Sequence, residues 1–450
     1  MITILLGLIG LSIVVIVHEL GHFVIARSVG VEVEAFSVGW GPALFKRKGK
    51  KTEWRIGVLP IGGYCKLKGE DGFRAALDQK LDFIPADKGS YYSAHPLKRV
   101  AIAIAGPSFN VLFATLVFVF VVAIGTTIQT APNRIVLSSE TGAMIQNGMP
   151  NPADIAGLET GDVIRAVDGK TIRDYSDLQE IIASNPGKAL SVEVLRNGSV
   201  QNLVITPHLD RNSGAGVIGV YAWVDPVIAT VKDQSPAAIA DLRAGDIITE
   251  ANGKAIHNTV DLMEVFKNAS GPVSLMVMRD AEPFPTTIVA KSLEEMGIGF
   301  VSVIRTDKAT SLPDAVSKGF KETASTFSLT IKSIGLLFRG VNVFKAVSGP
   351  ARITYLIGTA ASEQIKADGL AGLVPVLSFL AYLSVALAIT NLLPLPVLDG
   401  GLILVFIIEF LRKRALTPQA LYRFQFIGAA FVLVLFIVAT MSDVFFFAGK

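Results

Sequence analysis

The sequence predicts a polytopic α-helical membrane protein with four transmembrane helices, a membrane-associated β-hairpin or sheet, and two tandem α+β domains. Three observations support this fold class. Hydrophobic residues make up 51% of the 450 residues and charged residues only 18%, whereas soluble proteins average about 25% charged residues. The hydrophobic residues are concentrated in long runs. A polar middle region lies between these runs and contains an internal repeat.

Four apolar regions are long enough to cross a bilayer, which takes about 20 residues of helix. They are residues 1–29, 97–126, 371–411 and 425–448. The third region is about twice the length that one span requires, and prolines and glycines interrupt it. The first region lacks the basic start of a cleaved signal peptide, so we interpret it as a retained span.

Lysine and arginine residues indicate the orientation of these spans. Many of them lie between the first two spans, and a second group, Arg412–Arg414, lies between the last two. The positive-inside rule places both connections in the cytoplasm. Both termini and the large middle region are therefore expected on the outer side of the membrane.

Residues 30–96 are expected to form a cytoplasmic, membrane-associated β region. The stretch VEVEAFSVGWG (31–41) alternates polar and apolar residues, and TEWRIGVLPIGGYCKL (52–67) is rich in β-formers and punctuated by proline and glycine. Two such stretches in succession predict a hairpin or a small sheet. This β region would directly follow the first span.

The middle region, residues 130–303, contains the repeat. NPADIAGLETGDVIRAVDGK (151–170) aligns without gaps on SPAAIADLRAGDIITEANGK (235–254). The pattern resembles a PDZ domain, which predicts two PDZ-like domains over 130–222 and 223–303. Such domains bind extended peptides by adding a strand to a sheet edge. A pair that acts only as a spacer or steric cap is an equal alternative.

Residues 311–347 are predicted to contain an amphipathic helix. Apolar residues recur there at three- and four-residue spacing, with lysines and an arginine among them. Such a helix lies along a membrane or packs against the core of its own protein. The apolar positions are Val316, Phe320, Phe327, Ile331, Ile334, Phe338 and Val341.

The first predicted span contains the most informative motif, VIVHELGHFVIA (15–26). Each ionisable side chain there costs on the order of 3 kcal/mol to insert into the membrane, so a purely structural explanation is poor. His18 and His22 are four residues apart and project from one face of a helix. Two neutral imidazoles at this spacing can bind one Zn²⁺. Glu19 lies beside them, positioned to accept a proton from a metal-activated water.

A catalytic zinc site usually has three protein ligands and one open position, so a third ligand is expected in another span. The stretch TNLLPLPVLDGG (390–401) interrupts the third apolar region. A broken helix in a membrane is tolerated where it lines a cavity or is buried in protein. Asp399 is the natural third ligand there, although a simple turn capped by this aspartate is an alternative. Asn391 offers its amide to a substrate backbone.

These motifs together resemble the site-2 protease family of intramembrane zinc metalloproteases, in particular its bacterial regulator-of-sigma-E type. The motifs are His-Glu-x-x-His in the first span, Asn-x-x-Pro-x-Pro-x-x-Asp-Gly in a late span, and PDZ domains between them. The resemblance covers nearly the whole chain. It implies that His18, His22 and Asp399 hold Zn²⁺, that Glu19 is the general base, and that Asn391 positions the substrate.

A further stretch, AGPSFN (105–110), matches the Gly-Pro-x-x-Asn motif of that family in the second span. By the resemblance, Gly106 and Pro107 permit close approach of helices near the site. Asn110 would give polar support.

The resemblance also gives the β region a role, because a protease that cuts a membrane helix must hold its substrate locally extended. The family has a sheet at this point that dips into the membrane and offers an edge for strand addition. We expect that edge at 53–59, although an ordinary cytoplasmic hairpin is the alternative. The residues expected to contact substrate are Trp54, Ile56, Val58, Gly39 and Gly41.

The resemblance implies an enzyme of the bacterial inner membrane, with the PDZ-like domains and both termini in the periplasm and the active site toward the cytoplasm. Its substrates would be single-span membrane proteins, such as an anti-sigma factor already trimmed on the outer side, and leftover signal peptides. The PDZ-like domains would contact outer segments of these substrates. Membrane lipid would surround the spans.

Two other functions remain open from the residues alone. A metal or proton transporter also uses buried ionisable residues and broken helices. A membrane-tethered PDZ scaffold with a structural metal is the second alternative. Nucleic-acid binding is not expected, because the net charge is only +3 and no basic segment stands out.

Overall fold

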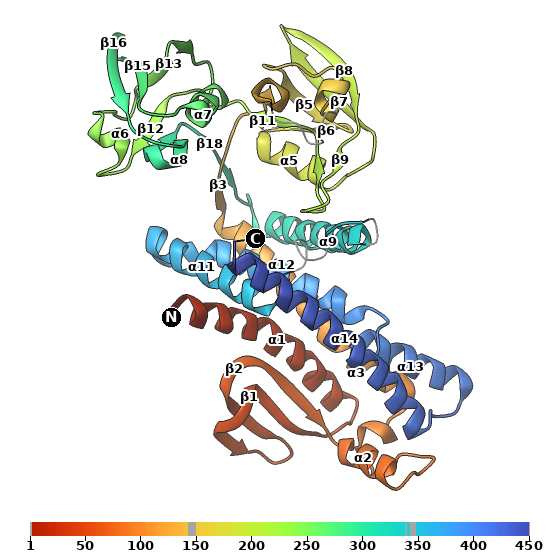
Figure 1. Ribbon diagram of the computed structural model, residues 1–450. Helices are drawn as coiled ribbons and strands as arrows, with labels where there is room; N and C mark the ends of the chain where they lie inside the picture. Colours follow the sequence, from red (N-terminus) through yellow and green to blue (C-terminus); the bar gives the residue numbers. More distant parts are fainter. Residues whose placement is uncertain (1, 143–149, 338–339, 343–347, 450) are drawn as a thin grey trace. The chain divides into compact units, whose positions relative to one another are not determined.

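The computed structural model describes residues 2–142, 150–337, 340–342 and 348–449 (Figure 1). The chain divides into two compact units. Unit 1 combines Met1–Thr126 with Asp307–Lys450, and unit 2 is Thr127–Thr306. Each unit has its own architecture.

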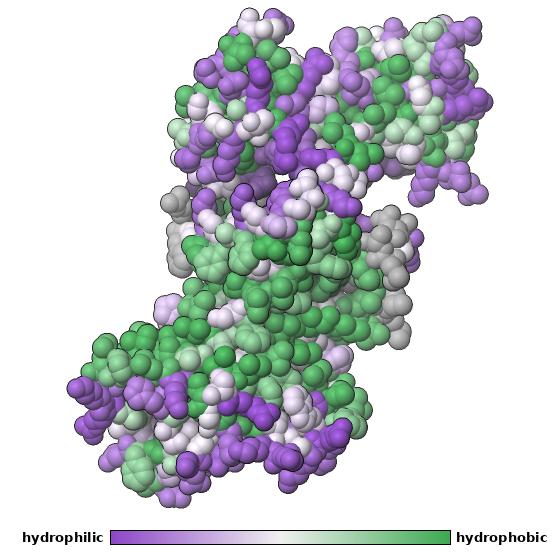
Figure 2. Space-filling view, turned by 180° about the vertical axis from the view of Figure 1, so that it is seen from behind, coloured by the Kyte–Doolittle hydropathy of each residue, from purple (hydrophilic) through white to green (hydrophobic). Residues whose placement is uncertain are grey.

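Among its described residues, unit 1 contains four helices that are long and apolar enough to cross a membrane, as predicted. Their outer surfaces form a broad apolar area on the helical unit (Figure 2), which suits contact with lipid rather than water. The fourth is the most exposed: Phe426 and Ile427 are 62% and 65% accessible. These helices are α1 (Ile2–Ser28), α3 (Pro96–Ile124), α12 (Leu373–Leu392) and α14 (Pro418–Phe447).

The third predicted region, 371–411, is one spanning helix followed by a shorter helix. Helix α12 ends at Leu392, and α13 (Asp399–Arg412) begins after the proline-containing break. Two glycines let the chain turn back this tightly. A Cβ at Gly400 would lie 2.3 Å from the carbonyl oxygen of Leu392, and one at Gly401 would lie 2.1 Å from that of Leu395. The break therefore places the start of α13 directly against the end of α12.

The β region is one long hairpin of β1 (Val33–Lys48) and β2 (Glu53–Leu67) that folds back on itself. Residues 33–38 pair with 63–67 on one side and with 53–56 on the other, and 43–48 also pair with 53–57. The order across the sheet is thus 43–48, 53–57, 33–38, 63–67. Its outer strands are 43–48 and 63–67.

This order corrects the expectation of an edge at 53–59 for residues 53–56. Residues 53–56 have a neighbouring strand on both sides, so a substrate strand cannot be added there. Sequence alternation identifies strands but not their neighbours. The alternation of residues therefore did not predict that β1 turns back on itself. The free edge nearest the first span is 63–67, because Gly62 and Gly63 lie against Val15 and Ile16 of α1.

The predicted amphipathic helix is α9 (Leu312–Leu337). It packs against the protein's own helices: the hydroxyl of Thr323 bonds to that of Thr115 on α3 at 3.1 Å. Phe327 and Ile334 join the apolar cluster of α3 and α12, whereas Phe320 remains 62% exposed. Packing against the protein's own core, one of the two environments expected for this helix, is therefore observed, and contact of its exposed side with a membrane stays a prediction. Residues 338–339 and 343–347 of the predicted range lie outside the described residues, and the predicted helix position Val341 lies beyond the end of α9.

Helix α11 (Pro350–Asp368) was not expected from the sequence. It crosses α1 at very short range, since a Cβ at Gly358 would lie 1.8 Å from the carbonyl oxygen of Thr3. The Asp443 carboxylate of α14 accepts the backbone NH groups of Gly349, Ala351 and Arg352 at the start of α11. Unit 1 also contains α2 (Glu70–Asp78), η1 (Tyr91–Ser93) and η3 (Gly369–Gly372).

Unit 2 contains two similar arrangements, each with a four-stranded antiparallel sheet. The first has the order β6-β5-β7-β8 and the second β14-β13-β15-β16, with a register shift at the corresponding place in both. Each sheet covers its own apolar cluster. These strands are β5 (Val163–Val167), β6 (Lys170–Thr171), β7 (Leu190–Arg196), β8 (Ser199–Ile205), β13 (Ile247–Ala251), β14 (Lys254–Ala255), β15 (Val273–Arg279) and β16 (Glu282–Ile288).

The Gly-Asp pair of the repeated motif has the same structural use in both arrangements. Asp162 and Asp246 are each 1% exposed. Each accepts two hydrogen bonds from one arginine at the end of a central strand, Arg196 or Arg279. A buried carboxylate requires such pairing, which explains why the motif and the strand recur together.

Shorter elements complete unit 2. Strands β3 and β18 pair with one another, as do β4 with β11, β9 with β10, and β12 with β17. The strands are β3 (Thr126–Thr130), β4 (Ile135–Leu137), β9 (His208–Leu209), β10 (Gly216–Val217), β11 (Val220–Ala222), β12 (Ile228–Val231), β17 (Ile298–Phe300) and β18 (Val303–Asp307). The helices are η2 (Ser138–Thr141), α4 (Pro152–Ile155), α5 (Tyr175–Ala183), α6 (Pro236–Ile239), α7 (Thr259–Asn268) and α8 (Leu293–Met296).

Candidate active site and metal centre

The histidine pair lies on one face of α1, as its spacing predicts. The Nε2 atoms of His18 and His22 are 3.2 Å apart, and the ring centroids are 4.8 Å apart. His18 is buried and His22 half-buried. Two lone-pair nitrogens thus converge on one point inside the helical unit.

Asp399 reaches the same point from the first residue of α13. Its Oδ2 lies 3.1 Å from His18 Nε2, and its Oδ1 lies 3.6 Å from His22 Nε2. One ligand atom from each of the three residues lies within 4.8 Å of the others. Within the described part of the chain, the buried Oδ2 accepts no hydrogen bond. The break between α12 and α13 is therefore what delivers this carboxylate to the histidines.

The ring of His22 is oriented by the backbone of α3. Its Nδ1 lies 2.8 Å from the carbonyl oxygen of Ile102. A carbonyl oxygen only accepts, so Nδ1 carries the proton and Nε2 presents its lone pair to the site. This tautomer is the one that binds a metal through Nε2.

The ring of His18 meets Asn110, which is completely buried. The Asn110 Nδ2 lies 3.3 Å from His18 Nδ1, and its Oδ1 has no hydrogen-bond partner among the described residues. Turning the carboxamide by 180° exchanges these two atoms without changing its shape. Oδ1 then accepts the His18 Nδ1 proton, which leaves His18 Nε2 with its lone pair toward the site. The Ser384 hydroxyl of α12 donates to the backbone carbonyl of Asn110 at 3.0 Å.

Gly106 of α3 lies directly beside the two imidazole rings. A Cβ at this position would lie 2.5 Å from His22 Nε2 and 2.7 Å from His18 Nε2. Close approach of the helices also depends on Gly21 of α1, whose Cβ would lie 2.4 Å from the carbonyl oxygen of Ala105. Only hydrogen at position 106 leaves room beside the lone pairs. Pro107 follows inside α3 and is buried.

Glu19 and Asn391 complete the polar surroundings. Glu19 follows His18 on α1, and its carboxylate interacts electrostatically with both histidines and with Asp399. The backbone NH of Cys65 on β2 also interacts with this carboxylate. Asn391, near the end of α12, has its Nδ2 3.3 Å from His18 Nε2. The groups brought together are a paired-histidine and carboxylate cluster, a second carboxylate, and an amide.

Comparison with known proteins identifies the family. The model of "Peptidase family M50" matches residues 6–435. The chain belongs to peptidase family M50. It is 40% identical to a candidate zinc metalloprotease of Treponema pallidum (strain Nichols), over 99% of each chain. It is 30% identical to protease RseP of Yersinia pestis and 29% identical to the regulator of sigma E protease of Haemophilus influenzae, in each case over 97% of both chains.

The M50 peptidase is thus an intramembrane zinc metalloprotease of the site-2 protease type, in a bacterial inner membrane. This assignment decides against the transporter and scaffold alternatives. Zinc is its cofactor. The donor set fits this ion, because two imidazole nitrogens and one carboxylate oxygen leave a fourth tetrahedral position open. The buried Asp399 Oδ2, which faces His18 Nε2 at 3.1 Å, and the space beside Gly106 support the same conclusion.

A cavity of about 550 Å³ adjoins the His18, His22 and Asp399 cluster of this M50 peptidase. His22 and Asp399 form one part of its wall, and Cys65 and Leu67 of the outer strand of β2 form another. Leu402 and Phe406 of α13 also line it. Sequence reasoning did not single out Cys65, Leu67 or the buried Ser384. The serine has a weak signal, because it lies seven residues, or two helical turns, before Asn391.

The residues expected to contact substrate in the β region are not among those that line this cavity. The Trp54 ring packs against Phe23 of α1, with the ring centroids 5.2 Å apart. Ile56 and Val58 are each 47% exposed. Gly39 and Gly41 have positive φ angles of 84° and 91°, which glycine adopts without strain. Both lie inside β1, between residues 33–38 and 43–48, where this strand turns back.

Proposed function

We propose that His18, His22 and Asp399 hold the catalytic zinc and that Glu19 is the general base for peptide-bond hydrolysis. The single observation that carries this proposal is the convergence of the two Nε2 atoms and the Asp399 carboxylate from separate helices. Bound zinc supplies a polarised water whose pKa falls toward about 7. The Glu19 carboxylate accepts a proton from that water and later delivers it to the leaving nitrogen.

Other residues hold this arrangement in place. The Ile102 carbonyl and the Asn110 side chain fix the tautomers of the two histidines. The Asn391 amide lies close enough to the centre to donate to the substrate backbone. Gly106 and Pro107 keep α3 close to the histidines while leaving the metal position open.

The substrate is held extended along the outer strand 63–67 of β2. Two observations support this edge over the expected one. It has a partner strand on one side only, and its Cys65 and Leu67 side chains share a cavity with His22 and Asp399. A substrate strand added there passes the zinc position. Its backbone groups bond to β2 instead of bonding to one another within a substrate helix.

The substrates are single-span membrane proteins such as anti-sigma factors that have been trimmed on the outer side, and remnant signal peptides. Two of the relatives are named for this system: protease RseP and regulator of sigma E protease. The positive-inside rule, applied to the lysines and arginines of 30–96 and to Arg412–Arg414, supports a cytoplasmic position for those segments. Both termini and unit 2 are then periplasmic.

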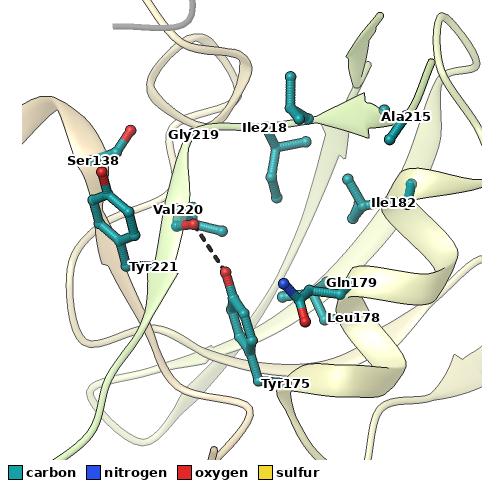
Figure 3. A pocket seen from close by; sticks show the side chains of 13 residues that line it. Ser138, Tyr175, Leu178, Gln179, Ile182, Ala215, Ile218, Gly219, Val220 and Tyr221 are labelled. Carbon is teal, nitrogen blue, oxygen red and sulfur yellow. Dashed lines mark hydrogen bonds between the residues drawn. The ribbon is translucent and has the colours of Figure 1, made fainter. Parts of the chain in front are cut away.

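Unit 2 is a pair of PDZ-like domains over 130–222 and 223–303, of which 143–149 lie outside the described residues. In the first, a groove lies between α5 and the segment 215–221 (Figure 3). Its position between a helix and a strand is the one in which PDZ domains add a peptide strand. The proposed role is contact with, or exclusion of, the outer segments of substrates.

The test is cleavage of a purified single-span substrate, tagged at both ends, by the purified protein in proteoliposomes. Removal of zinc with a chelator should abolish cleavage, and added zinc should restore it. His18→Ala, His22→Ala and Asp399→Ala should each lose both zinc and cleavage. His257→Ala, an exposed histidine of unit 2, is the matched control and should keep both. Full zinc content and activity in Asp399→Ala would remove that residue from the site.

A further inference from the structure

The groove of the first repeat in unit 2 is an uncharged, largely apolar site of about 450 Å³. One wall is α5, which presents Leu178 and Ile182, and the other is the segment 215–221 (Figure 3). None of the residues that line it carries a formal charge. An occupant that matches this lining is an extended, uncharged peptide with apolar side chains at alternate positions.

Strand β11 offers its backbone to such a peptide at only two residues. On its other side β11 pairs with β4, where Ser138 NH bonds to the Gly219 carbonyl and Trp223 NH to the Arg134 carbonyl. Backbone groups alternate between the two sides of a strand. Since 219 and 223 point toward β4, the backbone groups of Val220 and Ala222 point to the opposite side, and Val220 lines the groove beside α5.

One of these backbone groups is already bound within the domain. The Tyr175 hydroxyl, at the start of α5, donates to the Val220 carbonyl at 2.9 Å (Figure 3). Burial, followed by the neighbouring Tyr221, raises the pKa of Tyr175 to about 12, so the hydroxyl keeps its proton at neutral pH. A peptide NH that pairs with Val220 must compete with this hydroxyl for the same carbonyl.

The second repeat lacks this arrangement. Thr259 begins α7 as Tyr175 begins α5: the backbone NH of Thr259 bonds to the carbonyl of Val224, and that of Tyr175 bonds to the carbonyl of Ala131. The two helices also have equivalent N-cap residues, Asp174 and Asn258. A threonine hydroxyl is attached at Cβ and cannot extend across a groove as a tyrosine hydroxyl does.

We propose that Tyr175 is an internal cap of the first groove, which an extended uncharged peptide must displace from the Val220 carbonyl in order to bind. This inference rests on the peptide-binding role proposed for unit 2. The cap lowers affinity in the first repeat only and makes the two repeats unequal. A substrate segment is then held there only if its apolar side chains outweigh the loss of the Tyr175 hydrogen bond.

The test compares Tyr175→Phe with the unchanged full-length protein in detergent micelles. The probe is the fluorescein-labelled peptide Gly-Ser-Val-Ser-Val-Ser-Val, and binding is measured by fluorescence polarisation. Phenylalanine keeps the ring but frees the Val220 carbonyl for the peptide. One hydrogen bond corresponds to about three- to tenfold tighter binding. Tyr221→Phe, which removes a hydroxyl from the same groove, is the matched control and should bind as the unchanged protein does.

Equal affinity of Tyr175→Phe and the unchanged protein, with equal thermal unfolding midpoints, would overturn the cap but leave the groove as a peptide site. No saturable binding by either protein would overturn both the cap and the peptide-binding role. An equal gain in Tyr221→Phe would also overturn the cap, because the effect would then follow from lost polarity alone. Proteolytic activity is tested separately at the zinc centre, so these outcomes do not depend on it.

Discussion

At the scale of single residues, Gly106 decides whether the two histidines can share a metal. Its missing side chain leaves the space beside both Nε2 atoms, and a methyl group there would lie 2.5–2.7 Å from them. We expect Gly106→Ala to weaken zinc binding by about ten- to a hundredfold, since forcing one extra methyl group into a packed site costs about 1–3 kcal/mol. Zinc content after competition with a graded chelator measures this directly.

Gly335→Ala is the matched control for this substitution. Gly335 also lies in a helix, but a Cβ there meets no other atom within 4 Å. This variant should keep zinc and cleavage. Unchanged zinc affinity in Gly106→Ala would show that the histidines do not bind a metal in the observed arrangement.

Asn110 should act through His18. Asn110→Leu removes the acceptor for the Nδ1 proton and should lower zinc affinity by about 10- to 100-fold, the usual effect of losing a group that orients a metal ligand. Asn110→Asp keeps an oxygen in the same place and should lose much less. If the leucine and aspartate variants bind zinc equally well, Asn110 does not orient the histidine.

The residues of the centre differ in how visible they were in the sequence. The spacing of His18 and His22 and the interrupted apolar run around Asp399 were sufficient to bring those residues together. The group that orients His22 is a backbone carbonyl, that of Ile102, and any residue type could supply it. No sequence pattern can identify such a partner.

At the scale of secondary-structure elements, the outer strand of β2 is expected to be the edge that holds substrate. Proline has no backbone NH, so a proline in an edge strand removes one donor that an added substrate strand would use. Proline substitutions at Cys65, Lys66 and Leu67 in turn should include variants that lose cleavage while zinc stays bound. Initial rates and zinc content should be measured together.

The opposite edge of the same sheet gives the control. Proline substitutions at Phe45, Lys46 and Arg47 affect the other outer strand and should leave cleavage closer to normal. If the two edges respond equally, or only the second one responds, the substrate is not added beside 63–67.

Elements were predictable where apolar length alone defined them. The four spanning helices meet that condition. Helix α11 does not meet this condition, because its apolar side is short. It packs against α1 at Gly358. Its start depends on Asp443, 94 residues from Gly349. The sheet order likewise depends on β1 turning back along β2, which alternation along a single strand does not specify.

At the scale of the whole molecule, unit 2 is expected to control access rather than perform chemistry. The proposed metal ligands all lie in unit 1. Within unit 1, a hydrogen bond also joins the segment that leads into unit 2 to the segment that follows it: the Ala309 NH bonds to the Val122 carbonyl at 2.9 Å. Replacing 127–306 by a short glycine-serine linker should therefore leave zinc content and cleavage of a trimmed substrate intact. Substrates with large outer domains should now be cut prematurely.

A folded deletion variant that binds zinc but cuts no substrate would contradict this role. Unit 2 would then be a required docking element. The control is the same linker replacement combined with Glu19→Gln, which should remain inactive toward both trimmed and untrimmed substrates.

The most direct test of the central claim concerns Glu19, because a base and a ligand respond differently to the same substitution. Glu19→Gln keeps the shape of the side chain but cannot accept the water proton. Zinc content and cleavage must be measured on one preparation. We predict full zinc and a rate lower by about 10²–10⁴-fold, with uncut substrate still bound. Near-normal cleavage, or zinc lost together with activity, would contradict the assignment of Glu19 as the general base of a zinc site built from His18, His22 and Asp399.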